Sequence, residues 1–144
     1  MKTIEIFTDG ACRGNPGDGG WGVLIRTDGH EEKIYGGEEN TTNNRMELLA
    51  TIKALNFIAA NSNVTLTTDS KYVIDGITKW IENWKIKNWK KSDNKPVLNK
   101  DLWILLDQAS SNHSISWHWV RGHTGHRENE IADELANKGI DELS

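Results

Sequence analysis

The first part of the chain places apolar and polar residues in short runs typical of β-strands. The run at 4–10 is rich in β-branched and aromatic residues and stops at an acid followed by glycine. The glycine-rich stretch 11–20 predicts an irregular turn whose backbone can lie close to a ligand. Strand patterns at 21–26 and 32–37 are separated by Asp28-Gly29, a strong hairpin signal. These segments predict an antiparallel meander of three strands.

After this meander, the apolar positions recur mainly at helical spacing. Thr41-Thr42-Asn43-Asn44 offers capping side chains, and Gly139 provides a stop signal for the last helix. The segment 80–99 is polar, dotted with tryptophan and closed by Pro96, which predicts a short helix and a long excursion from the sheet. The pattern predicts further helices at 45–59, 71–80, 101–109 and 127–139, and strands at 64–69 and 115–120.

This order of elements predicts an α/β protein. The three-strand meander and two parallel strands would form a five-stranded mixed sheet flanked by helices. With 144 residues, the chain fits a single domain spanning 1–144. No run reaches the ~18 apolar residues of a membrane span, and the polar start lacks the apolar core of a secretory signal. We therefore expect a cytoplasmic protein that folds as a monomer and has no membrane partner.

Charge is distributed unevenly along the chain. The formal net charge is −4, but residues 79–100 hold seven lysines against two acids and carry +5, which leaves −9 for the remainder. A positive limb on an acidic body can attract a polyanion locally, and an acidic pocket can collect metal ions. Cys12 is the single cysteine, so any metal would be held by oxygen or imidazole ligands rather than by a set of thiolates.

Four acids are candidates for one site. Asp9 and Asp69 each end a predicted strand, and if these strands are parallel neighbours the two carboxylates finish side by side. Glu47 near the start of one helix and Asp133 in the middle of the last belong to elements that pack on the same sheet. Each acid also has an ordinary explanation: turn initiation for Asp9, a capping box for Glu47 and a solvated helix position for Asp133.

Clustered carboxylates repel one another unless one is protonated or a cation binds between them. Oxygen ligands without thiols suit Mg²⁺ or Mn²⁺. Two such ions ~3.5–4 Å apart can activate water on one side of a phosphodiester and stabilise the leaving oxygen on the other. The acids therefore point to hydrolysis of a nucleic-acid backbone.

Several motifs, taken in order, resemble bacterial ribonuclease H type 1. They are Asp9-Gly10-Ala11-Cys12-Arg13-Gly14-Asn15-Pro16-Gly17, Thr41-Thr42-Asn43-Asn44-Arg45-Met46-Glu47, Thr68-Asp69-Ser70, Lys95-Pro96-Val97, Asp101-Leu102-Trp103, and Trp119 to His126 followed by Asn129, Glu130 and Asp133. The resemblance covers nearly the whole chain, and the ordered set is highly specific.

The resemblance implies the ribonuclease H fold and cleavage of the RNA strand of an RNA–DNA hybrid, leaving a 3′-hydroxyl and a 5′-phosphate. It implies two Mg²⁺ ions, with Mn²⁺ as an alternative. Their ligands would be Asp9, Glu47, Asp69 and Asp133, while His123 would assist proton movement or product release. A zinc site at His123 and His126 is disfavoured because no cysteine stands nearby in the sequence, and His118 lies within a predicted strand, where a packed histidine is the more common explanation. A non-catalytic hybrid-binding module is the alternative function.

The resemblance also implies the substrate contacts. Amides at Asn15, Asn43 and Asn44, with Cys12 alongside, would read the 2′-hydroxyl, and these amides also serve as turn and cap residues. Thr42 and Asn99 would hold DNA phosphates. Lys71 stands where relatives often have glutamine, and would reach a phosphate instead; Asn40 replaces an arginine common in relatives. The segment 80–99 corresponds to the family's handle, whose candidate contacts are Trp80, Lys85 and Lys87, with helix packing as the other explanation for Trp80.

Overall fold

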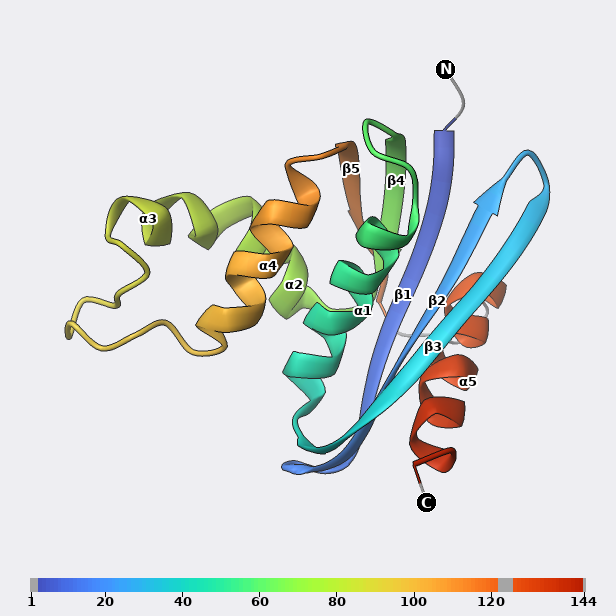
Figure 1. Ribbon diagram of the computed structural model, residues 1–144, viewed down its shortest axis with the longest axis horizontal. Helices are drawn as coiled ribbons and strands as arrows, with labels where there is room; N and C mark the ends of the chain where they lie inside the picture. Colours follow the sequence, from blue (N-terminus) through green and yellow to red (C-terminus); the bar gives the residue numbers. More distant parts are fainter. Residues whose placement is uncertain (1–2, 122–125, 144) are drawn as a thin grey trace.

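The computed structural model of the protein describes residues 3–121 and 126–143. Its strands are β1 (Thr3–Gly14), β2 (Gly17–Thr27), β3 (His30–Thr41), β4 (Asn63–Thr68) and β5 (Ser114–Trp119). They form one sheet in the order β3-β2-β1-β4-β5 (Figure 1). The pairs β1–β2 and β2–β3 are antiparallel, whereas β1–β4 and β4–β5 are parallel. The predicted mixed sheet, a meander plus two parallel strands, is confirmed.

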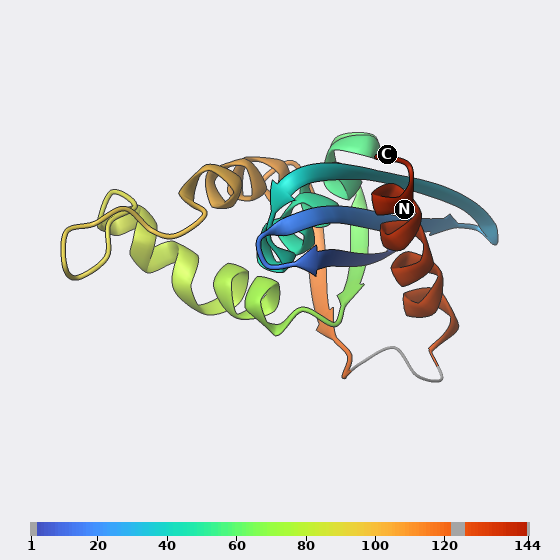
Figure 2. The same cartoon turned by 90° about the horizontal axis from the view of Figure 1, so that it is seen from below.

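Helices cover both faces of this sheet. They are α1 (Asn43–Phe57), α2 (Lys71–Asp75), the π-helical segment η1 (Gly76–Trp80), α3 (Ile81–Ile86), α4 (Lys100–Ser110) and α5 (Arg127–Asp141). α1 packs between the sheet and α4, while α5 lies across β1, β2 and β3 on the other face (Figure 2). Within the part of the chain that the structure describes, no helix combines the length and the apolar character needed to cross a membrane.

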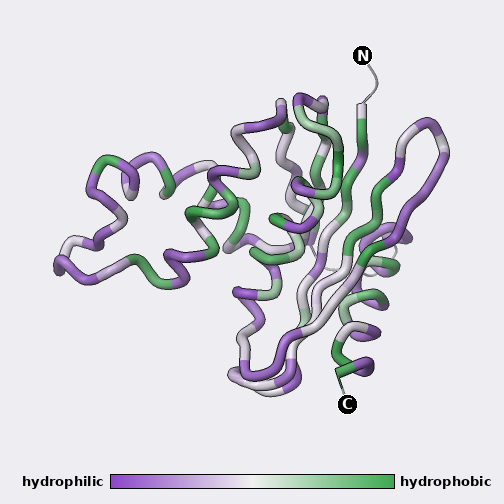
Figure 3. Tube along the Cα trace, in the orientation of Figure 1, coloured by the Kyte–Doolittle hydropathy of each residue, from purple (hydrophilic) through white to green (hydrophobic). Residues whose placement is uncertain are grey.

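The main core lies between the sheet and α1, which explains why that helix is buried along most of its length. The hydrophobic colour in Figure 3 follows the central strands and α1, whereas the outer end of the handle is largely hydrophilic. Fully buried side chains from strands and helices meet in this core; they include Ile6, Val23, Leu48, Leu66 and Leu106. The handle therefore projects from the packed body as a mainly polar limb.

The prediction of an irregular turn over residues 11–20 is wrong. β1 continues to Gly14, which pairs with Gly17 at the start of β2, so most of the stretch is a β-hairpin. A Cβ atom at Gly20 would collide with the carbonyl oxygen of Ala136 in α5. The glycines of β2 therefore serve close packing of a helix on the strand, which the composition does not distinguish from a loop.

Two of the predicted helices extend beyond their predicted ends at places where a glycine packs closely against another element. α5 passes through Gly139 and ends at Asp141, because Gly139 allows the helix to approach the backbone of Gly36 in β3 rather than to terminate. The helix predicted at 71–80 continues to Ile86, with η1 in its middle. A Cβ at Gly76, where η1 begins, would overlap the ring of Trp103.

Candidate active site

The register of the two central parallel strands places Asp9 beside Asp69. The β1–β4 pairing ends at Thr8 and Thr68, so each acid occupies the next position of its chain. Asp9 lies within β1 rather than at its end, which corrects the predicted strand boundary, but the parallel pairing does stop there. The expected juxtaposition thus follows from where the parallel pairing ends.

Glu47 reaches the same place from α1. This helix is capped by Thr42, whose hydroxyl accepts the Arg45 N–H at 3.3 Å, and the Glu47 side chain is buried instead of closing a capping box. Gly10 permits the approach, because a Cβ there would lie 2.5 Å from the Glu47 backbone nitrogen. A missing side chain on β1 therefore sets how closely α1 can bring Glu47 to Asp9.

The three carboxylates form a compact cluster. Asp9, Glu47 and Asp69 each offer an oxygen, and these oxygens lie within 4.8 Å of one another. Burial, followed by repulsion from Glu47 and Asp69, raises the pKa of Asp9 from 3.8 to about 10. Burial and repulsion from Asp69 also raise the pKa of Glu47 well above its ordinary value. Both shifts favour protonated carboxyl groups when no cation is bound, and a divalent cation would compete with these protons.

The fourth predicted acid, Asp133, enters from α5. Asp9 pairs with Gly22, and a Cβ at Gly22 would collide with the carbonyl oxygen of Ala132, so this position of the sheet faces α5. Hydrogen bonding and charge from Asp133 add to the causes that raise the pKa of Asp9. All four predicted carboxylates thus interact, while His123 lies outside the described residues.

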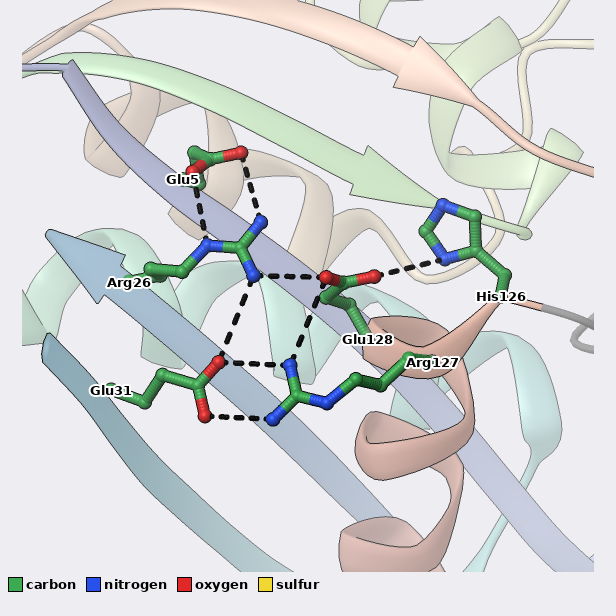
Figure 4. Close-up of polar contacts among 6 residues, drawn as sticks. All are labelled: Glu5, Arg26, Glu31, His126, Arg127 and Glu128. Atoms are coloured by element: carbon green, nitrogen blue, oxygen red, sulfur yellow. Dashed lines mark hydrogen bonds and ion pairs between the residues drawn. The ribbon is translucent and has the colours of Figure 1, made fainter. Parts of the chain in front are cut away.

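An ion network fixes the first turn of α5 to the sheet (Figure 4). Arg26 of β2 donates to both carboxylate oxygens of Glu5 at 3.0 and 3.1 Å and to Glu128 of α5 at 2.9 Å. Arg127 donates to Glu31 of β3 at 3.0 and 3.1 Å. The helix that carries Asp133 is therefore tied to three strands.

We expect Arg26→Met to lower the free energy of unfolding by about 1–2 kcal/mol near pH 7. Arg26 holds the pKa of Glu128 below its ordinary value of 4.5. This stabilisation is present above that value and is lost as the pH falls through the lowered pKa, so the difference from wild type should shrink in acid. Urea unfolding across pH measures it. Arg13→Met, which removes an exposed ion pair to Asp141, is the control; a difference that does not change with pH would contradict the assignment.

A second group of predicted contacts surrounds a cavity of about 410 Å³. Its lining includes Asn15, Thr42, Asn43, Asn44 and Asn99. The Asn43 N–H donates to Asn15 Oδ1 at 3.1 Å, which leaves the amide NH₂ of Asn15 available to donate. The structure thus brings together residues that are far apart in sequence and gives the cavity a mixed donor and acceptor surface.

Asn99 is held by groups that the sequence did not reveal. Its Oδ1 accepts from Arg45 Nη1 at 3.2 Å, and its Nδ2 donates to the Tyr72 hydroxyl at 3.1 Å. The same hydroxyl accepts from Trp103 Nε1 at 3.0 Å, and Arg45 is also paired with Asp101 at 2.7 Å. The Asn99 amide therefore has a fixed orientation at the cavity.

Other predicted contacts lie elsewhere on the surface. Cys12 donates from Sγ to the Gly14 carbonyl at 2.8 Å near the hairpin end, while Lys71 lies at the start of α2. In the handle, Trp80 packs on Trp84 with ring centroids 5.7 Å apart and is still 37% exposed. Trp80 therefore packs within the handle and also keeps an exposed surface that a nucleic acid could contact.

Trp119 is a candidate that the sequence prediction missed as a contact. Its indole Nε1–H donates to the main-chain oxygen of Asp69 at 3.0 Å, so an aromatic side chain stands beside the carboxylate cluster. The available signal was its position at the end of a predicted strand neighbouring the one that leads to Asp69.

A five-stranded mixed sheet with a carboxylate cluster at the end of its parallel pairing defines the class of α/β proteins with an acidic site that could hold a metal ion. The family model for RNase H matches residues 1–141. The chain belongs to the ribonuclease H family, whose members are metal-dependent endonucleases. The family resemblance stated from the motifs is confirmed.

Individual relatives agree with this assignment. The chain is 61% identical over 140 residues to a ribonuclease H of Halorhodospira halophila, covering 97% of this chain and 94% of the relative. It is 57% identical over 144 residues to a ribonuclease H of Hydrogenovibrio crunogenus, covering 100% and 99%. The crystal structure of LC9-RNase H1, described as a type 1 RNase H with the type 2 active-site motif, has a TM-score of 0.90 at 33% identity, covering 100% of this chain and 74% of that one.

A further solved structure is of LC11-RNase H1 in complex with an RNA/DNA hybrid. It has a TM-score of 0.73 at 25% identity and covers 98% of this chain and 99% of that chain. This relative was therefore solved bound to a hybrid while sharing the fold over nearly the full length.

Proposed function

We propose that this protein hydrolyses the RNA strand of RNA–DNA hybrids and leaves 3′-hydroxyl and 5′-phosphate ends. The observation that carries the proposal is the cluster of Asp9, Glu47 and Asp69, whose ligand oxygens lie within 4.8 Å of one another, in a chain of the ribonuclease H family. The LC11 relative in complex with an RNA/DNA hybrid supports the substrate class. We further propose that the protein acts as a monomer of one domain.

The cluster fits a pair of Mg²⁺ ions, with Mn²⁺ as the alternative. Its donors are carboxylate oxygens, and the raised pKa values of Asp9 and Glu47 reflect burial and repulsion from neighbouring acids, both of which a bound cation would offset. Asp9, Glu47, Asp69 and Asp133 would hold the ions. When bound, such ions activate water and stabilise the leaving oxygen of a phosphodiester.

The chain's own residues supply binding and orientation. The amides of Asn15, Asn43 and Asn44 can both donate to and accept from a ribose 2′-hydroxyl, the group that distinguishes RNA from DNA. Thr42 and the fixed amide of Asn99 face the same cavity and would hold the DNA backbone. We also assign His123 a role in proton movement or product release, as the family pattern implies.

The test is incubation with labelled RNA–DNA hybrid, duplex RNA and duplex DNA, in Mg²⁺ and then with a chelator. We expect cleavage in the RNA strand of the hybrid alone, lost on chelation. End-labelling of the products checks for the 3′-hydroxyl and 5′-phosphate. Hybrid binding without cleavage in Mg²⁺ or Mn²⁺ would instead identify a non-catalytic binding module, and cleavage of duplex DNA would contradict the substrate assignment.

The handle lysines should contribute unequally to hybrid affinity. Lys85 Nζ lies 3.5 Å from Asp107 Oδ1 and 3.7 Å from Glu82 Oε1, whereas Lys87 forms no ion pair with another described residue. We expect Lys87→Ala to reduce the magnitude of the slope of log affinity against log salt concentration by about 1. Lys85→Ala should reduce it less, because a lysine already paired with acids of the protein displaces fewer counterions from the nucleic acid. Fluorescence anisotropy over a salt series measures both slopes. Equal slopes in the two variants would remove this distinction.

A further inference from the structure

Trp119 combines wide exposure with a fixed place beside the carboxylate cluster. It ends the edge strand β5, pairs with Thr68 of β4 and is 41% exposed. Its indole N–H donates a hydrogen bond to the main-chain oxygen of Asp69 at 3.0 Å, which ties the indole to the segment that carries a carboxylate of the cluster. A large exposed aromatic side chain is thus held at the rim of the site.

Two cations flank the same ring. Lys71 Nζ lies 5.8 Å and Arg121 Cζ 5.9 Å from the Trp119 ring centroid. Both side chains are exposed, and neither makes an ion pair with another described residue. Because an exposed cation–π contact contributes only about 0.5–1 kcal/mol, both charges remain available to an anion.

The negative charge of the rest of the chain indicates what these two cations can contribute to nucleic-acid binding. The handle carries much of the chain's positive charge, and the sequence outside residues 79–100 sums to −9. A nucleic-acid strand that reaches the carboxylate cluster meets buried acids, so cations at the rim would offset repulsion where the strand enters. Figure 2 shows the ends of β4 and β5 lying together at this edge of the molecule.

We infer that Trp119, Lys71 and Arg121 form a clamp for the strand being cut. The two cations bind phosphates next to the scissile phosphate, and the indole packs against the sugar or base between them. The ligand is the RNA backbone, because Trp119 is hydrogen-bonded to Asp69 and successive phosphates of one strand are only ~3.4 Å apart along the helix axis. This inference rests on the proposed function and assigns the clamp residues a shared binding role in it.

Phosphate interference tests the clamp. Short hybrids would carry one neutral methylphosphonate at successive RNA positions around a single cleavage site, with a matching series in the DNA strand. We expect Lys71→Ala and Arg121→Ala each to lower kcat/KM about fivefold to tenfold on the unmodified hybrid. At one flanking RNA position, the neutral linkage should abolish the difference between each variant and wild type. Undiminished effects at every RNA position, or masking by the DNA series instead, would overturn the inference.

Two controls separate the clamp from general damage. Lys53→Ala removes a similar cation–π contact, in which Lys53 Nζ of α1 lies 5.9 Å from the ring centroid of Trp21 in β2, and should leave kcat/KM unchanged. Trp119→Phe should retain most of the activity that Trp119→Leu loses, because the phenyl ring keeps a stacking face. Equal losses in Phe and Leu variants that melt like wild type would eliminate the aromatic contact. Cleavage of the unmodified hybrid by wild type tests the proposed function separately.

Discussion

We expect Asp9→Asn to lower hybrid cleavage in Mg²⁺ by on the order of 10³-fold or more while hybrid binding stays measurable. The variant keeps the shape of the side chain but removes a negative oxygen from the cluster that Asp9 forms with Glu47 and Asp69. Single-turnover cleavage and anisotropy of the same labelled hybrid measure the two quantities. Activity near the wild-type value would contradict the role of the cluster.

The same substitution should stabilise the metal-free protein at about pH 8. The pKa of Asp9 rises from 3.8 in its ordinary state to about 10 in the fold, so the folded protein binds more protons than the unfolded chain across that interval. The contribution of the Asp9 carboxyl to stability is complete below pH 3.8 and is lost as the pH rises from there through about 10. Asparagine does not ionise, so its contribution does not change with pH. We expect a Tm increase of at least about 5 °C in chelator.

Thermal melts with chelator and with Mg²⁺ separate charge relief from a general effect on folding. Mg²⁺ should raise the Tm of wild type more than that of Asp9→Asn, because the variant has lost one ligand. Glu134→Gln removes an exposed charge from α5 and should alter neither the metal-free Tm nor cleavage. A metal-free Asp9→Asn variant that melts below wild type would show that the carboxylates are not in electrostatic conflict.

The convergence of Asp9 and Asp69 could be predicted because it depends on strand order and on parallel pairing, which apolar runs and an intervening helix indicate. The exact approach of Glu47 could not. It depends on contact between Gly10 and the α1 backbone, and the glycine looks in sequence like the start of a loop. The same ambiguity explains why the irregular turn predicted at 11–20 is wrong, since glycines of β2 in this stretch allow a helix to pack closely on the strand.

Side-chain networks were also beyond sequence reasoning. The capping signal at Thr42 was visible, but the contact of Arg45 with Asn99 joins residues 54 positions apart. The Tyr72 hydroxyl that fixes Asn99 gives no local pattern, because the two residues are 27 positions apart in the sequence. Spacing thus predicts which residues share a helix or strand, whereas the orientation of a binding group depends on contacts made between elements.

Gly10, the glycine beside the carboxylate cluster, provides the sharpest geometric prediction. We expect Gly10→Ala to lower the free energy of unfolding by about 1–3 kcal/mol and cleavage by about 100-fold. The new Cβ would lie 2.5 Å from Glu47 N and 2.6 Å from the carbonyl carbon of Met46, both backbone atoms that no rotamer change can move. α1 must then retreat by roughly 1 Å to reach ordinary contact, and Glu47 retreats with it.

Urea unfolding and Mg²⁺ titration of cleavage, both well below the melting range, distinguish a displaced ligand from a less stable fold. Gly29→Ala is the matched control: its φ of +77° makes a side chain unfavourable by about 1–2 kcal/mol, but a Cβ there meets no atom within 4 Å. We expect this control to lose stability and keep its Mg²⁺ dependence, whereas Gly10→Ala should need more Mg²⁺ for half-maximal cleavage. If both variants lose stability alike and cleave like wild type, the distance between α1 and β1 does not set the geometry of the carboxylates.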